Sequence, residues 1–287
     1  MRCVIRFSND KEYQFFMASG MMGFDGNGAT VAHKHLYCLL SKMGLYDPSL
    51  FAITTKTITF HPISGPKQIK PLKNGWWNNY GLDNPGLNKF LLENSKEIKK
   101  KNNIIISFAG KKRYDLRIMV DVMLSKFKNI LALEYDVACS NCEEVRVGAN
   151  ETIRNTEFLK RNFNNVDFFL KVGKASNHYK MIAKETEGMV KALRINSIPA
   201  KGGGALSGKI AQPENWLIME ELLEASKTPV IAPSIWNYED MDFVLKMGAA
   251  GIDFGSVSMS HPMRLWAPML PSLWARRYEE QQRRNSY

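Results

Sequence analysis

The chain has 287 residues, of which 45% are hydrophobic, and this is enough to bury the core of one large domain spanning residues 1–287. It has no apolar run of membrane-spanning length, no signal peptide, and too few cysteines for a disulfide framework, so we expect a cytoplasmic protein without a membrane partner. Its net charge of +11 comes from scattered basic clusters, and this charge alone does not indicate a nucleic-acid partner.

The predicted elements begin with a hairpin. Its parts are Cys3–Phe7, the turn Ser8–Asp10 and Tyr13–Met17, which leads into a first strand. Eight short apolar runs follow one another along the chain, and each ends in a polar, small or glycine-containing cluster. They are Gln14–Gly20, Ala52–Thr59, Ile104–Gly110, Ile130–Cys139, Val166–Gly173, Val190–Ser197, Pro229–Ile235 and Gly251–Ser256.

Segments with helical periodicity lie between these runs, among them Tyr114–Phe127, Glu214–Ala225 and Glu239–Met247. Strands that alternate with helices favour parallel pairing and right-handed crossovers. Eight such units at this length predict an α/β protein, a (β/α)8 TIM barrel preceded by a β-hairpin.

Polar groups gather where the predicted strands end, which is the edge of a barrel that carries active sites. They are Ala18–Gly20, Lys56, Ser107, Asp136, Cys139, Lys171, Asn196, Ser197, Ser234, Gly255 and Ser256. Three long loops also follow strands, at His61–Asn88, Cys139–Asn150 and Pro199–Pro213. Loops of this length inside a compact domain are usually functional.

Seven segments resemble those of dihydroorotate dehydrogenases, in particular of the soluble, class 1-like enzymes, in the same order and at roughly the same spacing. They are Phe16–Gly20, Thr55–Thr57, Asn78–Gly86, Glu134–Asn141, Leu170–Lys171, Asn196–Ser197 and Gly204–Gly208. Each segment alone is unspecific, and the signal lies in having one at each of several strand ends. The resemblance implies an FMN-dependent oxidoreductase of CH–CH donors, which oxidises dihydroorotate to orotate in pyrimidine biosynthesis.

The resemblance also implies which residues bind the flavoprotein's FMN. These are Ala18, Gly20, Lys56, Lys171, Asn196, Ser197, Ser207, Gly208, Ser234, Gly255 and Ser256. Positive charge from the lysines suits a flavin ring that becomes anionic at N1 and O2 when reduced. We expect the FMN phosphate between the Ser234 turn and Gly255–Ser256, where barrels commonly bind phosphate.

Cys139 matches the family's catalytic base, which removes a proton from the carbon next to the substrate carbonyl. A cysteine at this position is typical of the soluble class, and a thiolate suits the task if its neighbours lower its pKa. Cys142 completes a C-x-x-C spacing, but no second pair or nearby histidine accompanies it, so we expect no metal.

The resemblance further implies the residues that bind the dihydropyrimidine substrate. They are Lys56, Asn78, Tyr80, Gly81, Leu82, Asp136, Asn141, Asn196 and Ser197. Amide side chains pair a donor with an acceptor, as the edge of a pyrimidine ring does. The backbone N–H groups of residues 80–82 are expected to face the substrate carboxylate.

Three departures from the family pattern bear on these expectations. Asp136 replaces an amide, and an ionised carboxylate accepts hydrogen bonds but cannot donate them. Pro233 stands in the turn whose amides hold the FMN phosphate, and proline has no N–H. In addition, Ala205 replaces a glycine of Gly-Gly-Leu-Ser-Gly, and the Gly-Asn-Pro loop with its arginine is reduced to Ser64–Lys67.

Other functions stay open at this stage. A dihydrouridine synthase acting on tRNA fits the positive charge, but a C-terminal helical RNA-binding domain is missing and Asn78–Gly86 argues against it. Pro233 and Asp136 also fit a barrel that has lost catalysis and serves as a binding or scaffold protein. The electron acceptor is fumarate, a nicotinamide reached through an iron–sulfur partner subunit, or quinone, which the missing membrane-binding extension disfavours. Soluble members are often homodimers.

Overall fold

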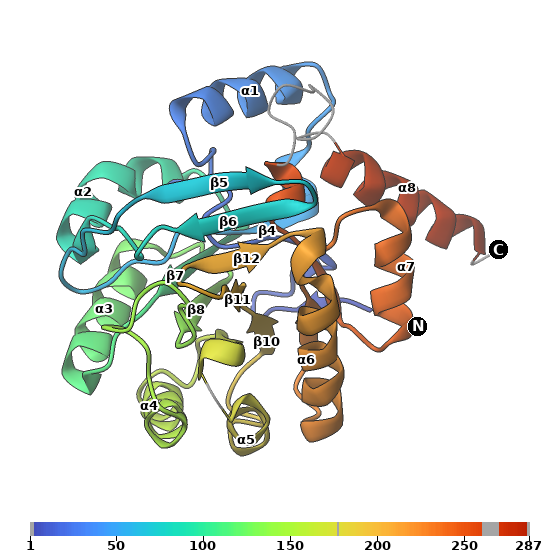
Figure 1. Cartoon of the computed structure of the whole chain (residues 1–287). Coiled ribbons are helices and arrows are strands. Elements are labelled where there is room, and N and C mark those ends of the chain that lie inside the picture. The colour runs from blue at the N-terminus through green and yellow to red at the C-terminus, as the bar shows by residue number, and fades with distance from the viewer. Residues whose placement is uncertain (1–2, 177, 260–269, 286–287) are drawn as a thin grey trace.

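Eight parallel strands form a closed barrel in the computed structural model, which describes residues 3–176, 178–259 and 270–285 (Figure 1). Around the barrel they are β3 (Phe15–Met17), β4 (Phe51–Thr54), β7 (Ile104–Phe108), β8 (Ala132–Asp136), β9 (Phe168–Val172), β10 (Ala192–Ile195), β13 (Val230–Ala232) and β14 (Gly251–Phe254). Seven of these strands lie wholly inside the predicted runs, and β4 begins one residue before its run. The predicted TIM barrel is therefore confirmed.

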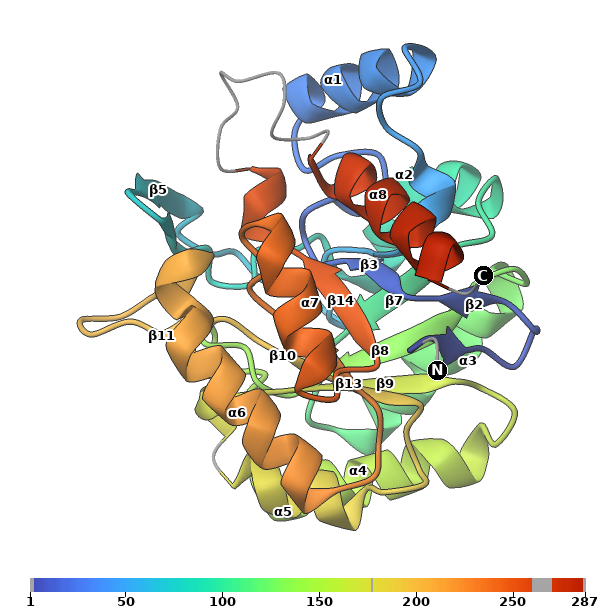
Figure 2. The ribbon, with the colours of Figure 1, turned by 90° about the vertical axis from the view of Figure 1, so that its right-hand side faces the viewer.

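Helices connect the strands and cover the barrel. They are α1 (Val31–Lys42), α2 (Gly86–Lys99), α3 (Arg113–Lys126), α4 (Ala149–Asn162), α5 (Tyr179–Glu185), α6 (Gln212–Ala225), α7 (Tyr238–Lys246) and α8 (Leu270–Asn285), with short 3-10 helices at Pro48–Leu50, Lys174–Ser176, Lys209–Ala211 and Ser256–Ser258. Figure 2 shows α6, α7 and α8 on one side of the barrel and α1 standing away from it. In the described part of the chain, no helix combines the length and hydropathy that a bilayer crossing requires.

The N-terminal hairpin closes one end of the barrel. Its strands β1 (Ile5–Arg6) and β2 (Glu12–Tyr13) pair antiparallel, and β3 follows as a separate barrel strand. Ile5 and Phe7 pack onto the innermost apolar layer of the barrel, where the Phe7 ring stacks on Phe169 at 5.7 Å between centroids. The hairpin thus confirms the sequence prediction and leaves the opposite end of the barrel for a site.

A small antiparallel sheet lies across that opposite end (Figure 1). Its strands, in spatial order, are β11 (Ile198–Pro199), β12 (Ala205–Ser207), β6 (Gly75–Asn79) and β5 (Gln68–Leu72). The two segments predicted as loops at 61–88 and 199–213 therefore contain strands. β6 pairs on one side with β5, in a local hairpin that the sequence prediction overlooked, and on the other side with β12, which is distant in sequence.

The barrel interior changes from apolar to polar toward the sheet-covered end. Side chains of a strand alternate between the two faces, so the residue two positions after an inward-facing one also faces inward. Next to the apolar layer of the hairpin end lies a layer of polar side chains, formed by Thr54, Ser107, Glu134, Lys171, Arg194 and Asp253. Barrel interiors are usually filled by branched apolar residues, so this layer marks a site.

Candidate active site

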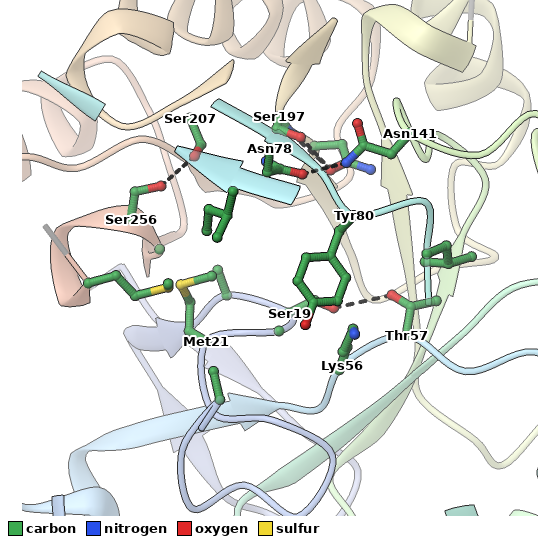
Figure 3. A pocket seen from close by; sticks show the side chains of 18 of the residues that line it. Ser19, Met21, Lys56, Thr57, Asn78, Tyr80, Asn141, Ser197, Ser207 and Ser256 are labelled. Carbon is green, nitrogen blue, oxygen red and sulfur yellow. Dashed lines mark hydrogen bonds between the residues drawn. The ribbon is translucent and has the colours of Figure 1, made fainter. Parts of the chain in front are cut away.

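A cavity of about 600 Å³ opens at the C-terminal ends of the barrel strands (Figure 3). This volume lies within the range of about 300–1,000 Å³ that small-molecule and cofactor sites occupy. Apart from Gly81, every residue expected to bind cofactor or substrate lines the cavity, as does Cys139. The strand ends converge there because all eight strands run parallel.

The layer of polar side chains in the barrel forms the floor of the cavity. Lys171 of β9 lies on this floor between two carboxylates. Its Nζ is 3.3 Å from Asp136 Oδ2 and 3.9 Å from Glu134 Oε1. Burial acts to lower the pKa of Lys171, but the two carboxylates outweigh it and raise this pKa above the ordinary value. Lys171 is therefore a fixed cation at the place where the sequence predicts one.

Asp136 ends β8, and both of its carboxylate oxygens are engaged by the protein. Oδ2 accepts from the Thr57 hydroxyl at 3.3 Å and from Lys171. Oδ1 accepts from the backbone N–H of Ala138 at 3.2 Å and from the Asn196 amide at 3.4 Å. The side chain lines the cavity but is almost completely covered.

Arg194 occupies the centre of the polar layer and was missed by the sequence reasoning. Its guanidinium donates to Glu134 at 2.9 Å and to Asp253 at 2.6 Å, and it also contacts the Thr54 hydroxyl. Burial raises the pKa of Asp253, and Arg194 opposes that rise. The available signal was a charged residue at an inward-facing position of each apolar strand, β8, β10 and β14.

Amide side chains meet at the side of the cavity under the small sheet. Asn141 donates through Nδ2 to Asn78 Oδ1, while its own Oδ1 is buried and accepts no hydrogen bond from any described residue (Figure 3). Asn196 donates to the Ala138 carbonyl at 2.9 Å and accepts from the Ser197 N–H at 2.8 Å. The unpaired oxygen of Asn141 is an acceptor available to a ligand.

Lys56 follows β4 and packs against aromatic rings. Its Nζ is 4.0 Å from the centre of the Tyr80 ring and 5.2 Å from that of Phe24. Burial lowers the pKa of Lys56 to about 8, although nearby Asp83 acts to raise it. Figure 3 shows the Tyr80 ring and the Lys56 amine side by side in the cavity. This cation is held by ring faces, which leaves its N–H groups available to an anion.

The turn after β6 is strained next to the cavity. Gly81 and Leu82 are both left-handed, with φ of 66° and 55°, and Asp83 N–H donates back to the Tyr80 carbonyl at 3.3 Å. A bulky residue such as leucine rarely adopts this conformation, and such strain concentrates at functional sites. Among the described residues, none accepts a hydrogen bond from the N–H groups of Gly81 and Leu82.

Cys139 lies in the loop after β8, and the loop covers its thiol. The residue is 7% exposed and packs with Cys142, Leu82 and Val145. Burial, together with the charge of Asp136, raises the pKa of the Cys139 thiol to about 12. The expected lowering of this pKa is therefore absent in this conformation, because desolvation outweighs the opposite effect of Lys171.

Hydroxyl and amide groups surround the end of the cavity near α6. The hydroxyls of Ser207 and Ser256 hydrogen-bond at 2.6 Å, and Ser234 is left-handed with φ of 61°. Asn215 donates to the Ser234 hydroxyl at 2.9 Å, and its Oδ1 is buried without a partner in the described residues. Asn215 was also missed, since nothing distinguishes it from other polar residues of a helix. Pro233 lines the cavity without filling it.

Comparison with known proteins assigns the family. No protein-family model matches the chain. The catalytic subunit of dihydroorotate dehydrogenase B (NAD(+)) from Thermodesulfovibrio yellowstonii is 30% identical over 236 residues, which cover 75% of this chain and 78% of the relative. The chain belongs to the dihydroorotate dehydrogenase family. The subunit of the same name from Malacoplasma penetrans is 24% identical over 241 residues, covering 76% of this chain and 78% of the relative.

Solved structures agree on the fold of this dihydroorotate dehydrogenase-family chain. An old yellow enzyme homologue from Zymomonas mobilis superposes with a TM-score of 0.53 at 12% identity, covering 90% of this chain and 89% of that one. A chain of the tryptophan synthase complex from Pyrococcus furiosus gives a TM-score of 0.50 at 12% identity, covering 93% of this chain and 96% of that one. At these identities the likeness concerns the barrel alone.

Proposed function

We propose that this chain is an FMN-dependent dehydrogenase that oxidises dihydroorotate to orotate. The observation that carries the proposal is the cavity itself. Two partly buried lysines, Lys56 and Lys171, line the same space as Cys139 and the amide pair Asn78–Asn141. A flavin site needs fixed positive charge, and a pyrimidine site needs convergent amide groups, so one cavity offers both.

The residues present fit FMN. The end of the cavity near α6 is polar and contains an orphaned amide oxygen, that of Asn215, which suits a hydroxyl group of the ribityl chain. We expect the phosphate between the Ser234 turn and Gly255–Ser256. For this the Ser207–Ser256 hydrogen bond must open and Asn215 must turn its N–H groups inward. When bound, FMN supplies the acceptor for the hydride.

The substrate fits between the amide pair and the strained turn. The carboxylate of dihydroorotate suits the N–H groups of Gly81 and Leu82 together with the Lys56 cation, while Asn141 Oδ1 accepts from a ring N–H. Cys139 accepts the proton that leaves the carbon next to the carbonyl. Because its thiol is protonated in the closed loop, proton transfer requires the loop to admit water or to move the thiol closer to Lys171.

The relatives' names bear on the electron acceptor. Each is the catalytic subunit of an NAD(+)-type enzyme, which implies a partner subunit in those proteins. We therefore favour the nicotinamide route, through an iron–sulfur partner, over fumarate and quinone. A homodimer of the catalytic chain is compatible with this arrangement.

The test begins with the colour of the purified protein. We expect a yellow protein whose flavin absorbance is bleached by dihydroorotate without oxygen, and a Cys139→Ala variant that keeps its flavin but is bleached about 10²–10⁴-fold more slowly. A yellow protein that does not respond acts on another dihydropyrimidine, and bleaching by dihydrouridine in tRNA would identify the synthase. A colourless protein that refuses added FMN contradicts the proposal and favours a barrel without catalysis.

A further inference from the structure

We propose that Asp136 is a positioning residue that holds Lys171 and compensates its charge on the cavity floor, and that it thereby lowers the reduction potential of the bound flavin. This inference rests on the proposed function, since it requires FMN in the cavity. It concerns a departure of this chain from its family, because an amide is expected where Asp136 stands.

The contacts of Asp136 leave it little capacity to bind a substrate ring. Each carboxylate oxygen already accepts two hydrogen bonds or ion-pair contacts, from Thr57 and Lys171 on one side and from Ala138 and Asn196 on the other. Two lone pairs on each oxygen are thereby directed at protein groups. The side chain is 3% exposed, so a ligand would have to displace one of these donors to reach it.

Lys171 has no equivalent alternative partner among the described residues. Glu134 is the other carboxylate near its Nζ, at 3.9 Å, and Glu134 is itself engaged by Arg194 and by the Ser107 hydroxyl at 2.8 Å. Asp136, at 3.3 Å, is the closer of the two. The pair with Asp136 therefore fixes both the position of the ammonium group and the charge that it presents to the cavity.

The charge of the floor follows from these pairs. Lys171 and Arg194 face the carboxylates of Glu134, Asp136 and Asp253, so these two cations are outnumbered by three carboxylates. An amide at position 136 would remove one negative charge and leave Lys171 without its nearer carboxylate partner. A reduced flavin ring is anionic, and a nearby uncompensated cation stabilises it in a medium of low dielectric constant. Asp136 thus favours the oxidised flavin.

The experiment measures the midpoint potential of bound FMN by anaerobic titration against a reference dye. We compare the parent with Asp136→Asn, Lys171→Gln and the double variant. The matched control is Asp167→Asn, which breaks the Asp167–Lys191 pair, 3.8 Å long, at the opposite end of β9. A second titration measures the dissociation constants of orotate and dihydroorotate for the same proteins.

We expect Asp136→Asn to raise the ratio of reduced to oxidised flavin about tenfold at a fixed ambient potential. For a two-electron couple this is a rise of about 30 mV in the midpoint potential. Lys171→Gln should lower the ratio, the double variant should return close to the parent, and Asp167→Asn should not change it. If Asp136→Asn fails to fold, the comparison of Lys171→Gln with the double variant isolates the same charge.

Two results would overturn the inference. An unchanged potential in Asp136→Asn, with FMN bound, shows that Asp136 does not compensate charge at the flavin. An unchanged potential together with a tenfold change in the dissociation constant of dihydroorotate shows that Asp136 binds the substrate instead. Failure of the proposed function looks different, because the parent itself then binds no FMN.

Discussion

Replacing Arg194 by methionine tests whether the polar layer of the barrel is ionised. Arg194 is 1% exposed and hydrogen-bonds to Glu134 and Asp253, so Arg194→Met leaves Asp253 without its described ion-pair partner and Glu134 with only Lys171 at 3.9 Å. Methionine approximates the length of the arginine stem, which limits the loss of packing. The change therefore isolates the electrostatic part of the interaction.

The expected loss follows from burial. Removing one partner of a buried, hydrogen-bonded ion pair costs about 3–5 kcal/mol, because the remaining charge is left uncompensated. For 287 residues the unfolding entropy at the midpoint is about 0.6 kcal/mol/K. Arg194→Met should thus lower the melting temperature by about 5–8 °C.

The dependence on pH has a definite sign. Burial already raises the pKa of Asp253 above its unfolded value, and Arg194→Met removes the group that opposes this rise. A carboxyl with a raised folded-state pKa stabilises the fold below its unfolded pKa and loses that contribution as pH rises through the folded value. The loss of stability caused by Arg194→Met should therefore be smaller at about pH 5 than at about pH 8.

The assay is thermal unfolding followed by circular dichroism at both pH values. The control is Arg117→Met on α3, whose ion pair with Asp121 at 3.7 Å is more than half exposed, so the loss should not exceed about 1 kcal/mol. If Arg194→Met melts within about 2 °C of the parent at both pH values, the layer does not depend on a buried cation and the reasoning is wrong.

Further outcomes are expected at the cavity. Lys56→Ala should slow flavin reduction, because losing the cation removes about 2–4 kcal/mol of transition-state stabilisation. Stopped-flow absorbance measures the rate of this reduction. Because the pKa of Lys56 is about 8, the affinity for orotate should fall as pH rises through that value, which titrations on both sides of it would show. Proton transfer to Cys139 requires the thiolate, so turnover should rise with pH. In Asp136→Asn this rise in turnover should occur at lower pH, since Asp136 raises the pKa of Cys139. Gly208→Ala places a Cβ 2.7 Å from Trp236, so it should destabilise the fold by more than Gly44→Ala, whose left-handed backbone costs about 1–2 kcal/mol in open space.

The sequence was sufficient for the barrel because its strands are short apolar runs separated by helical segments, a pattern that depends on local periodicity. It also placed Lys56, Lys171 and Cys139 near one another, since parallel strands bring their C-terminal ends to the same edge. Neither argument needed a long-range contact.

The features that were missed depend on contacts between distant segments. Trp76 and Trp77 pair with β5 in a local hairpin, which the sequence prediction overlooked, and also with β12, a pairing between distant segments that no local pattern contains. The high pKa of Cys139 arises because its loop folds over the thiol, whereas the motif alone favours a reactive thiolate. Arg194 was visible as a charge in an apolar strand, but its two partners lie on other strands.

The small sheet over the cavity also affects how the site forms during folding. Each strand–helix unit of the barrel makes local contacts, whereas Trp77 donates its indole N–H to the Gly203 carbonyl, 126 positions away. Contacts of such sequence separation carry a large loop-closure cost and form late. Closure of the barrel carries a cost of the same kind, since Ile252 of β14 pairs with Phe15 of β3, far away in the sequence, but the individual strand–helix units are able to form before the active site has a cover. For the same reason, local opening of β6 from β12 exposes the amide groups while the apolar end of the barrel stays closed.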